Sequence, residues 1–246
     1  MKTPFSRVSI WLLSLMFLGL AAQIDGHEQD PEARPKLLFA SIDAEPSSIL
    51  LGRILSAAYG YLGYELTIIS LPARRALMQA NDGGYDGDLA RMGNIGDQYP
   101  NLLAVPTPVI EFAAVAFTIG VTRDIEDWSS LSGLRIGIMR GMLFAEQGTL
   151  GLNPIELDNM ESLFSALAKD RLDVVIAIRE SGLLISQWLL PDAGIHPVGE
   201  ILFQGSMHHF LHKSHADLVP QIDAILRQMT ARGEIEQMHQ EYLHGR

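Results

Sequence analysis

Several arginines of this sequence stand where a predicted strand ends or a predicted helix begins. They are Arg75, Arg91, Arg140 and Arg179. The guanidinium group is planar and donates paired hydrogen bonds, so arginine suits the recognition of carboxylate and phosphate groups. In open α/β sheets, ligands gather at the carboxyl ends of the strands. We therefore predict that these arginines contact an anionic group of a small ligand.

Two other residues at strand ends belong to the same candidate site. Gly141 follows Arg140 and precedes a predicted helix, whose first backbone N–H groups favour an anion. Glycine also lets a ligand approach the backbone closely. Glu45 follows the first predicted strand. It either accepts a hydrogen bond from the ligand or only favours the positive end of the next helix, and both interpretations stay open.

Each arginine also has an ordinary structural interpretation. Arg75 suits a solvent-exposed first helical turn, and Arg91 suits a hinge or surface salt bridge. Arg140 and Gly141 suit a plain strand-to-helix turn, and Arg179 suits an ion pair with Glu180.

Aromatic residues often line ligand clefts, although they are more often part of a core. The candidates are Tyr85, Phe112, Trp128 and Phe144. Four histidines stand close together near the C-terminus: His208, His209, His212 and His215. If they lie on a strand, His208 and His212 are about 13 Å apart and cannot share one ion. We expect surface or turn histidines, and we predict no metal site, no cofactor and no catalytic residue.

Composition excludes several classes of protein. The 246 residues contain 29 acidic and 18 basic side chains, for a net charge of −11, which disfavours a nucleic-acid binder. Hydrophobic residues make up 48% of the chain, too many for a disordered protein. The absence of cysteine excludes disulfides and thiol chemistry. The G-x-S-x-G, H-E-x-x-H and P-loop motifs are also missing.

The N-terminus has the pattern of a secretory signal peptide. Lys2 and Arg7 precede an apolar run over residues 8–20, followed by Ala21 and Ala22. We predict a signal peptide over residues 1–22 and a flexible lead-in over residues 23–35, with an uncleaved anchor as the alternative. Because no cysteine follows, we expect a periplasmic protein that is not a lipoprotein.

From residue 36 onward, short apolar runs alternate with amphipathic stretches, which predicts an α/β fold. Predicted strands cover residues 37–42, 64–71, 85–92, 134–139, 154–158, 172–178 and 206–213. The βαβαβ order of the first elements indicates a parallel sheet with helices on its faces. A long apolar segment with Pro106 and Pro108 interrupts this order and suits a strand that crosses to a second unit. We therefore predict two lobes with a cleft between them.

The order of "LPARRAL…GGYDGDLARM", "LSGLRIGIMRG", "LAKDRLDVVIAI" and "HHFLHKSHADLVPQIDAIL" resembles the extracytoplasmic solute-binding proteins, family 3. The resemblance implies a type II periplasmic-binding-protein fold, each lobe being a mainly parallel sheet flanked by helices. We assign residues 36–119 and 206–246 to lobe 1 and residues 120–205 to lobe 2. The chain departs from the amino-acid binders of this family in two places. The stretch "MGNIGDQYPN" after the third predicted strand, where those binders place an arginine for the ligand carboxylate, has no arginine beyond Arg91. The chain also has Ile178 and Arg179 where they place an aspartate.

These features predict a periplasmic solute-binding protein that captures a small polar solute, with an anion as one option. The resemblance implies ABC transport, a membrane permease or receptor as partner, and a monomer. Two alternatives stay open: a ligand sensor acting through a membrane partner, and an enzyme resembling cyclohexadienyl dehydratase, with Glu45 or Glu111 as its acid or base.

Overall fold

The computed structural model describes residues 34–43, 45–92 and 95–243. The predicted signal peptide and residues 23–33 of the predicted lead-in lie outside this part of the chain. Within it, no helix is long and apolar enough to cross a bilayer.

One sheet organises residues 34–243, with the strand order β2-β1-β3-β9-β5-β8-β6-β7 and with β4 paired to β9. Its strands are β1 (Lys36–Ile42), β2 (Glu65–Leu71), β3 (Gly87–Met92), β4 (Leu102–Ala104), β5 (Ile110–Thr118), β6 (Ile136–Met139), β7 (Ile155–Leu157), β8 (Val174–Ile178) and β9 (His196–His212). The α-helices are α1 (Ser47–Tyr61), α2 (Ala73–Asn81), α3 (Leu143–Gly148), α4 (Met160–Ala168), α5 (Arg179–Leu189), α6 (Val219–Ala231) and α7 (Glu234–Leu243).

Two parallel groups of strands form the ends of this sheet. In the first half, β1 pairs in parallel with β2 and with β3, and α1 and α2 connect these strands. In the second half, β6 pairs in parallel with β7 and with β8. The predicted βαβαβ order is confirmed, and α2 has the bounds that Pro72 and the paired glycines after it predict.

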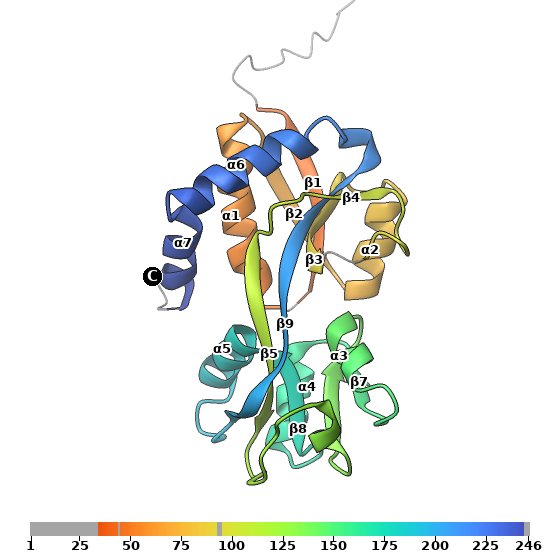
Figure 1. Ribbon diagram of the computed structural model, residues 1–246, viewed down its shortest axis with the longest axis vertical. Helices are drawn as coiled ribbons and strands as arrows, with labels where there is room; N and C mark the ends of the chain where they lie inside the picture. Colours follow the sequence, from red (N-terminus) through yellow and green to blue (C-terminus); the bar gives the residue numbers. More distant parts are fainter. Residues whose placement is uncertain (1–33, 44, 93–94, 244–246) are drawn as a thin grey trace, which may run out of the picture. The chain divides into compact units, whose positions relative to one another are not determined.

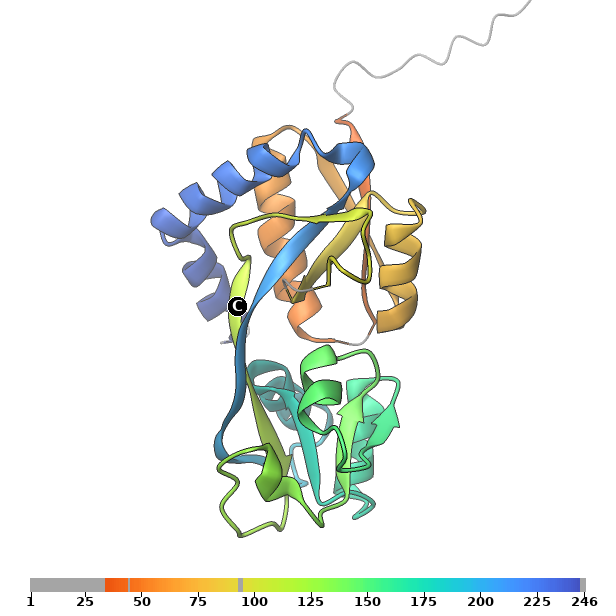
Figure 2. The same ribbon diagram turned by 45° about the vertical axis from the view of Figure 1, so that its right-hand side comes forward.

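The strands β5 and β9 join the two halves (Figures 1 and 2). They pair antiparallel, from Ile110 opposite Met207 to Thr118 opposite His196, with a register shift between Ala114 and Ala116. The strand predicted over residues 206–213 is thus only the last part of the 17-residue β9. Its earlier part contains Gly199 and Gly205, which weaken the strand signal. The predicted lobe boundaries stay a prediction.

The apolar core runs through both halves. His209 is a completely buried polar residue that packs against Phe39 and Tyr59, so the expectation of a surface or turn histidine is wrong at this position. The Tyr59 hydroxyl lies 2.8 Å from Nε2, and Nδ1 lies 2.9 Å from the Leu89 carbonyl oxygen. Since only an N–H can pair with that carbonyl, Nδ1 carries the proton and Nε2 accepts from Tyr59. Burial lowers the pKa of His209 to about 4.

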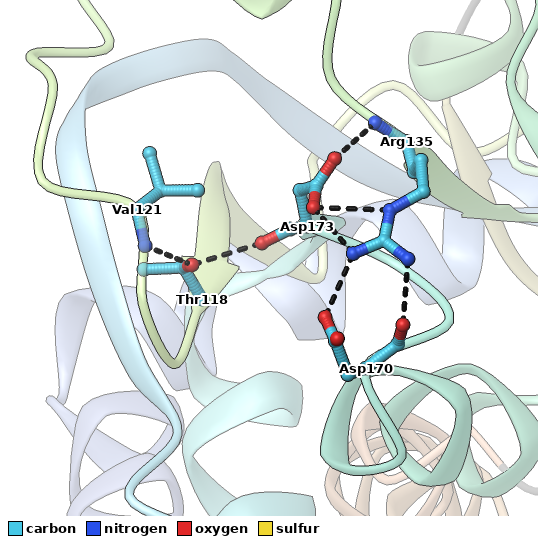
Figure 3. A network of polar contacts seen from close by, with 5 residues as sticks. All are labelled: Thr118, Val121, Arg135, Asp170 and Asp173. Atoms are coloured by element: carbon cyan, nitrogen blue, oxygen red, sulfur yellow. Dashed lines mark hydrogen bonds and ion pairs between the residues drawn. The ribbon is translucent and has the colours of Figure 1, made fainter.

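A polar network connects the end of β5 with the segments before β6 and β8 (Figure 3). The Arg135 guanidinium donates to Asp173 Oδ1 at 2.7 Å and to Asp170 Oδ1 at 2.7 Å. The buried hydroxyl of Thr118 donates to the Asp173 carbonyl oxygen at 2.9 Å and accepts from the Val121 N–H at 3.0 Å. One hydroxyl therefore satisfies two backbone groups where β5 ends.

Replacing this hydroxyl by a methyl group is expected to destabilise the protein. Thr118→Val keeps the shape of the side chain but leaves the Asp173 carbonyl and the Val121 N–H without a partner, which costs about 1–3 kcal/mol. Urea denaturation measures the free energy of unfolding. Thr118→Ser keeps the hydroxyl and serves as control, and equal losses in both variants would contradict this account.

Candidate functional site

A small cavity lies between the two halves of the sheet. Its lining comes from both, namely Ile42, Leu77, Ala90, Arg91, Met92, Ile95, Phe112, Gly141, Met142, Leu143, Phe144 and Met207. Its volume is about 40 Å³. A water molecule needs roughly 10–15 Å³ by this measure, so the cavity has room for a few waters only.

Arg91 is the charged residue of this lining, and it is only 6% exposed. Its Nε and Nη2 each donate to the Asp88 carboxylate at 2.9 Å, and Nη2 also donates to the Ala73 carbonyl oxygen at 3.3 Å. Asp88 is fully buried, and burial raises its pKa while the Arg91 charge opposes that change. The pair holds the guanidinium in one orientation, and Nη1 remains buried without a hydrogen-bond partner.

Glu45 lies in the loop between β1 and α1 and is 4% exposed. Its Oε1 accepts from the Ser47 hydroxyl at 3.0 Å and from the hydroxyl of Ser181, which belongs to α5 in the other half. Its Oε2 has no partner. Burial raises the pKa of Glu45, and the bonds from Ser181 and Ser47 lower it in part. The Glu45–Ser181 hydrogen bond thus links the two halves.

The buried side-chain polar atoms without a partner, among the described residues, are Ser41 Oγ, Glu45 Oε2 and Arg91 Nη1. Ser41 and Glu45 line a second cavity of about 20 Å³. This cavity shares Ile42, Ala90, Met142 and Met207 with the Arg91 cavity. Leaving a buried polar group unpaired costs free energy, so native proteins rarely do it. These three atoms therefore mark the candidate site.

The other predicted residues lie differently. Gly141 lines the Arg91 cavity, with a φ of +87° and with Ala73 Cβ only 2.8 Å from the place a Cβ would take. Its N–H, predicted to face a ligand, donates instead to Glu146 Oε1 at 2.6 Å. Arg140 is exposed and donates to Glu156 at 3.1 Å and to Asp158 at 2.5 Å.

Arg75 is exposed on α2 and does not line the Arg91 cavity, and Arg179 is the half-buried first residue of α5. Their contacts with a ligand stay predictions. Glu111, the other candidate acid, is exposed and accepts from the Ser206 hydroxyl at 2.9 Å.

Two of the predicted aromatic residues line the Arg91 cavity. The Phe112 ring packs 5.5 Å from that of Phe144, and Phe203 of β9 completes the group at 5.6 Å from Phe144. The Trp128 ring instead packs against Gly148. Tyr85 packs against a separate apolar cluster around α2.

Sequence reasoning missed two residues that shape the site. Asp88 stands three residues before Arg91 in the same strand, and an acid inside an apolar strand was the available signal. Ser181 lies 136 residues from Glu45, and no local pattern relates the two.

No protein-family model matches the chain. Two relatives from Shewanella resemble it in sequence. An uncharacterized protein of Shewanella oneidensis is 28% identical over 201 residues, which cover 76% of this chain and 74% of that protein. A putative sensor protein of Shewanella frigidimarina is 28% identical over 140 residues, which cover 55% of this chain and 21% of that protein. The matched segment thus spans about a fifth of the sensor's length.

Solved structures agree on the fold. An ancestral arginine-binding protein bound to arginine superposes with a TM-score of 0.74 at 16% identity, covering 85% of this chain and 98% of that chain. A histidine kinase sensor domain with similarity to periplasmic binding proteins has a TM-score of 0.72 at 13% identity, covering 85% and 96%. The chain therefore has the predicted α/β fold of periplasmic binding proteins, with a curled mixed sheet and flanking helices.

Proposed function

We propose that this chain is a periplasmic solute-binding protein of the family 3 type, exported by the signal peptide that the sequence predicts. It captures a small polar solute between its two halves and presents it to a membrane permease of an ABC uptake system. It works as a monomer, needs no cofactor and does no chemistry on the solute.

The observation that carries this proposal is the convergence of Ser41, Glu45 and Arg91 on cavities between the halves. Each presents one polar atom that the protein itself leaves unpaired. An acceptor group of a solute would pair Arg91 Nη1, and a donor group would pair Glu45 Oε2. Because Asp88 orients the guanidinium, its unpaired Nη1 is in position before the solute arrives.

The small volume of the Arg91 cavity requires a conformational step. A solute larger than a few waters enters only when the halves separate, and β5 and β9 are the strands that run through both halves. The solute then favours the closed state because only that state surrounds it on both sides.

A ligand sensor acting through a membrane partner is the second candidate. The putative sensor protein among the relatives and the histidine kinase sensor domain among the structures favour it. Capture of a solute between the halves is common to both functions. Co-purification with a permease supports the first, and co-purification with a membrane receptor supports the second.

Loss of the unpaired Arg91 Nη1 is expected to weaken solute binding. Arg91→Lys keeps a charge for Asp88 but lacks the second terminal nitrogen, and we expect about tenfold weaker binding of an anionic solute. A thermal-shift screen of small carboxylates identifies the solute, since saturation at a hundredfold excess stabilises the fold by about 2.7 kcal/mol.

Arg123→Lys is the matched control, because Arg123 is an exposed arginine that donates to the Ser132 carbonyl oxygen. Equal affinities in wild type, Arg91→Lys and Arg123→Lys would place the solute elsewhere. A screen in which no solute shifts the melting temperature would count against solute capture as a whole.

The carboxyl group of Glu45 is expected to reduce stability at neutral pH. Because its pKa is raised by burial, Glu45 loses its proton at a higher pH in the folded protein than in the unfolded chain, where it does so near pH 4.5. The free energy of unfolding of wild type therefore falls as the pH rises above about 4.5 and until Glu45 also ionises in the folded protein. Glu45→Gln removes the titrating group. The free energy of unfolding of this variant should therefore exceed that of wild type by about 1–3 kcal/mol at pH 7.5 and equal it near pH 4.

Urea denaturation between pH 4 and pH 8 measures this difference. Glu200→Gln removes one exposed negative charge and is the control. A constant difference between Glu45→Gln and wild type over the whole pH range would show that Glu45 is not held in an unfavourable buried position.

A further inference from the structure

A larger groove shares Ile42 with the Arg91 cavity, and residues of α1 and α5 form part of its lining. Its lining is Ser41, Ile42, Glu45, Pro46, Ser48, Ile49, Ile68, Ser70, Glu161, Ile185, Trp188 and Leu189. We call it the α1–α5 groove. Its volume of about 470 Å³ lies within the range of pockets that hold small organic molecules.

The charges of the α1–α5 groove all have one sign. Glu45 and Glu161 carry carboxyl groups, and no lysine, arginine or histidine belongs to its lining, all of which the structure describes. Glu161 alone would be explained by its place in the first turn of α4. Glu45 is different, because it is almost fully buried and its Oε2 has no partner.

The rest of the lining is mainly apolar, and part of it faces solvent. Trp188 is 55% exposed and Leu189 is 48% exposed, both on α5, while Ile49 of α1 is 51% exposed. An indole face attracts cations as well as apolar groups. Carboxylates beside such a surface match a molecule that carries a positive charge on an apolar body.

We propose that the α1–α5 groove is a subsite for an organic cation with an apolar body, such as a protonated aromatic amine. The ammonium group would pair with Glu45 Oε2 and face Glu161, while the apolar body would cover Trp188 and Leu189. This proposal rests on the proposed solute-binding function. It adds a second compartment, since Glu45 lines the groove but not the Arg91 cavity.

Three probes of similar shape and different charge test the proposal on the full-length chain. They are 2-phenylethylamine, which is a cation at pH 7, the neutral 2-phenylethanol and the anionic 3-phenylpropionate. Isothermal titration calorimetry gives the affinities. We expect saturable binding of the amine, about tenfold weaker binding of the alcohol, and no binding of the anion at this groove.

Variants locate the bound amine. We expect Glu45→Gln and Trp188→Ala each to weaken it about tenfold, and Glu161→Gln to weaken it a few-fold, because Glu161 is exposed. Glu200→Gln controls for the loss of an exposed charge, and Trp128→Phe controls for a tryptophan outside the groove. The amine should quench tryptophan fluorescence in wild type and in Trp128→Phe, and not in Trp188→Phe.

The proposal is overturned if the amine does not bind, if the alcohol binds equally well, or if Trp188→Ala and Glu45→Gln leave its affinity unchanged. Arg91→Lys separates this result from the proposed function. It should weaken anionic solutes and leave the amine unaffected, because Arg91 does not line the groove. Carboxylate binding that depends on Arg91, without amine binding, would leave solute capture standing and reject only the groove.

Discussion

The antiparallel pairing of β5 with β9 is the constraint on which the rest of this structure depends. These two strands belong to both halves, and their backbone hydrogen bonds join two parallel groups of strands into one sheet. The lining of the candidate site comes from both halves and from β5 and β9 themselves, which supply Phe112 and Met207. The pairing therefore determines which loops face each other, and its register shift between Ala114 and Ala116 lies along this connection. Bending of the same strands is the movement that would open the site.

The core and the candidate site differ in how completely their buried polar groups are paired. Deep in the core, polar groups are fully paired: His209 bonds to Tyr59 and Leu89, and Thr118 satisfies two backbone groups. Between the halves the pattern changes, because Ser41, Glu45 and Arg91 each leave an atom unpaired. Buried unpaired atoms lower stability, and a bound solute would remove that cost. Unpaired buried polar atoms of this kind are expected at a ligand-binding site.

The charges around the two spaces differ in sign. The chain carries a net charge of −11, yet Arg91 presents a guanidinium edge in the interior. The Asp88 carboxylate forms an ion pair with this guanidinium and fixes its orientation. The α1–α5 groove shares Ile42 with the Arg91 cavity, and the charged residues of its lining are the acids Glu45 and Glu161. The Arg91 cavity and the α1–α5 groove therefore carry charges of opposite sign, and the net charge of the chain does not predict this difference.

Much of the fold could be predicted from the sequence, because alternating apolar runs, turn glycines and prolines act over a few residues. The bounds of α2 and α7, the parallel β1, β2 and β3 and the two-part α/β order all follow from such local patterns. Part of the candidate site was predictable as well, since Glu45, Arg91 and Gly141 follow or end strands. The sequence could not show that the Gly141 N–H is taken by Glu146, that Arg140 turns to Glu156 and Asp158, or that His209 is buried. Those outcomes depend on which residues meet across long separations, such as the 136 residues between Glu45 and Ser181. Local chemistry determined the strands and helices, and only tertiary packing decided which polar atoms found partners and which remained unpaired.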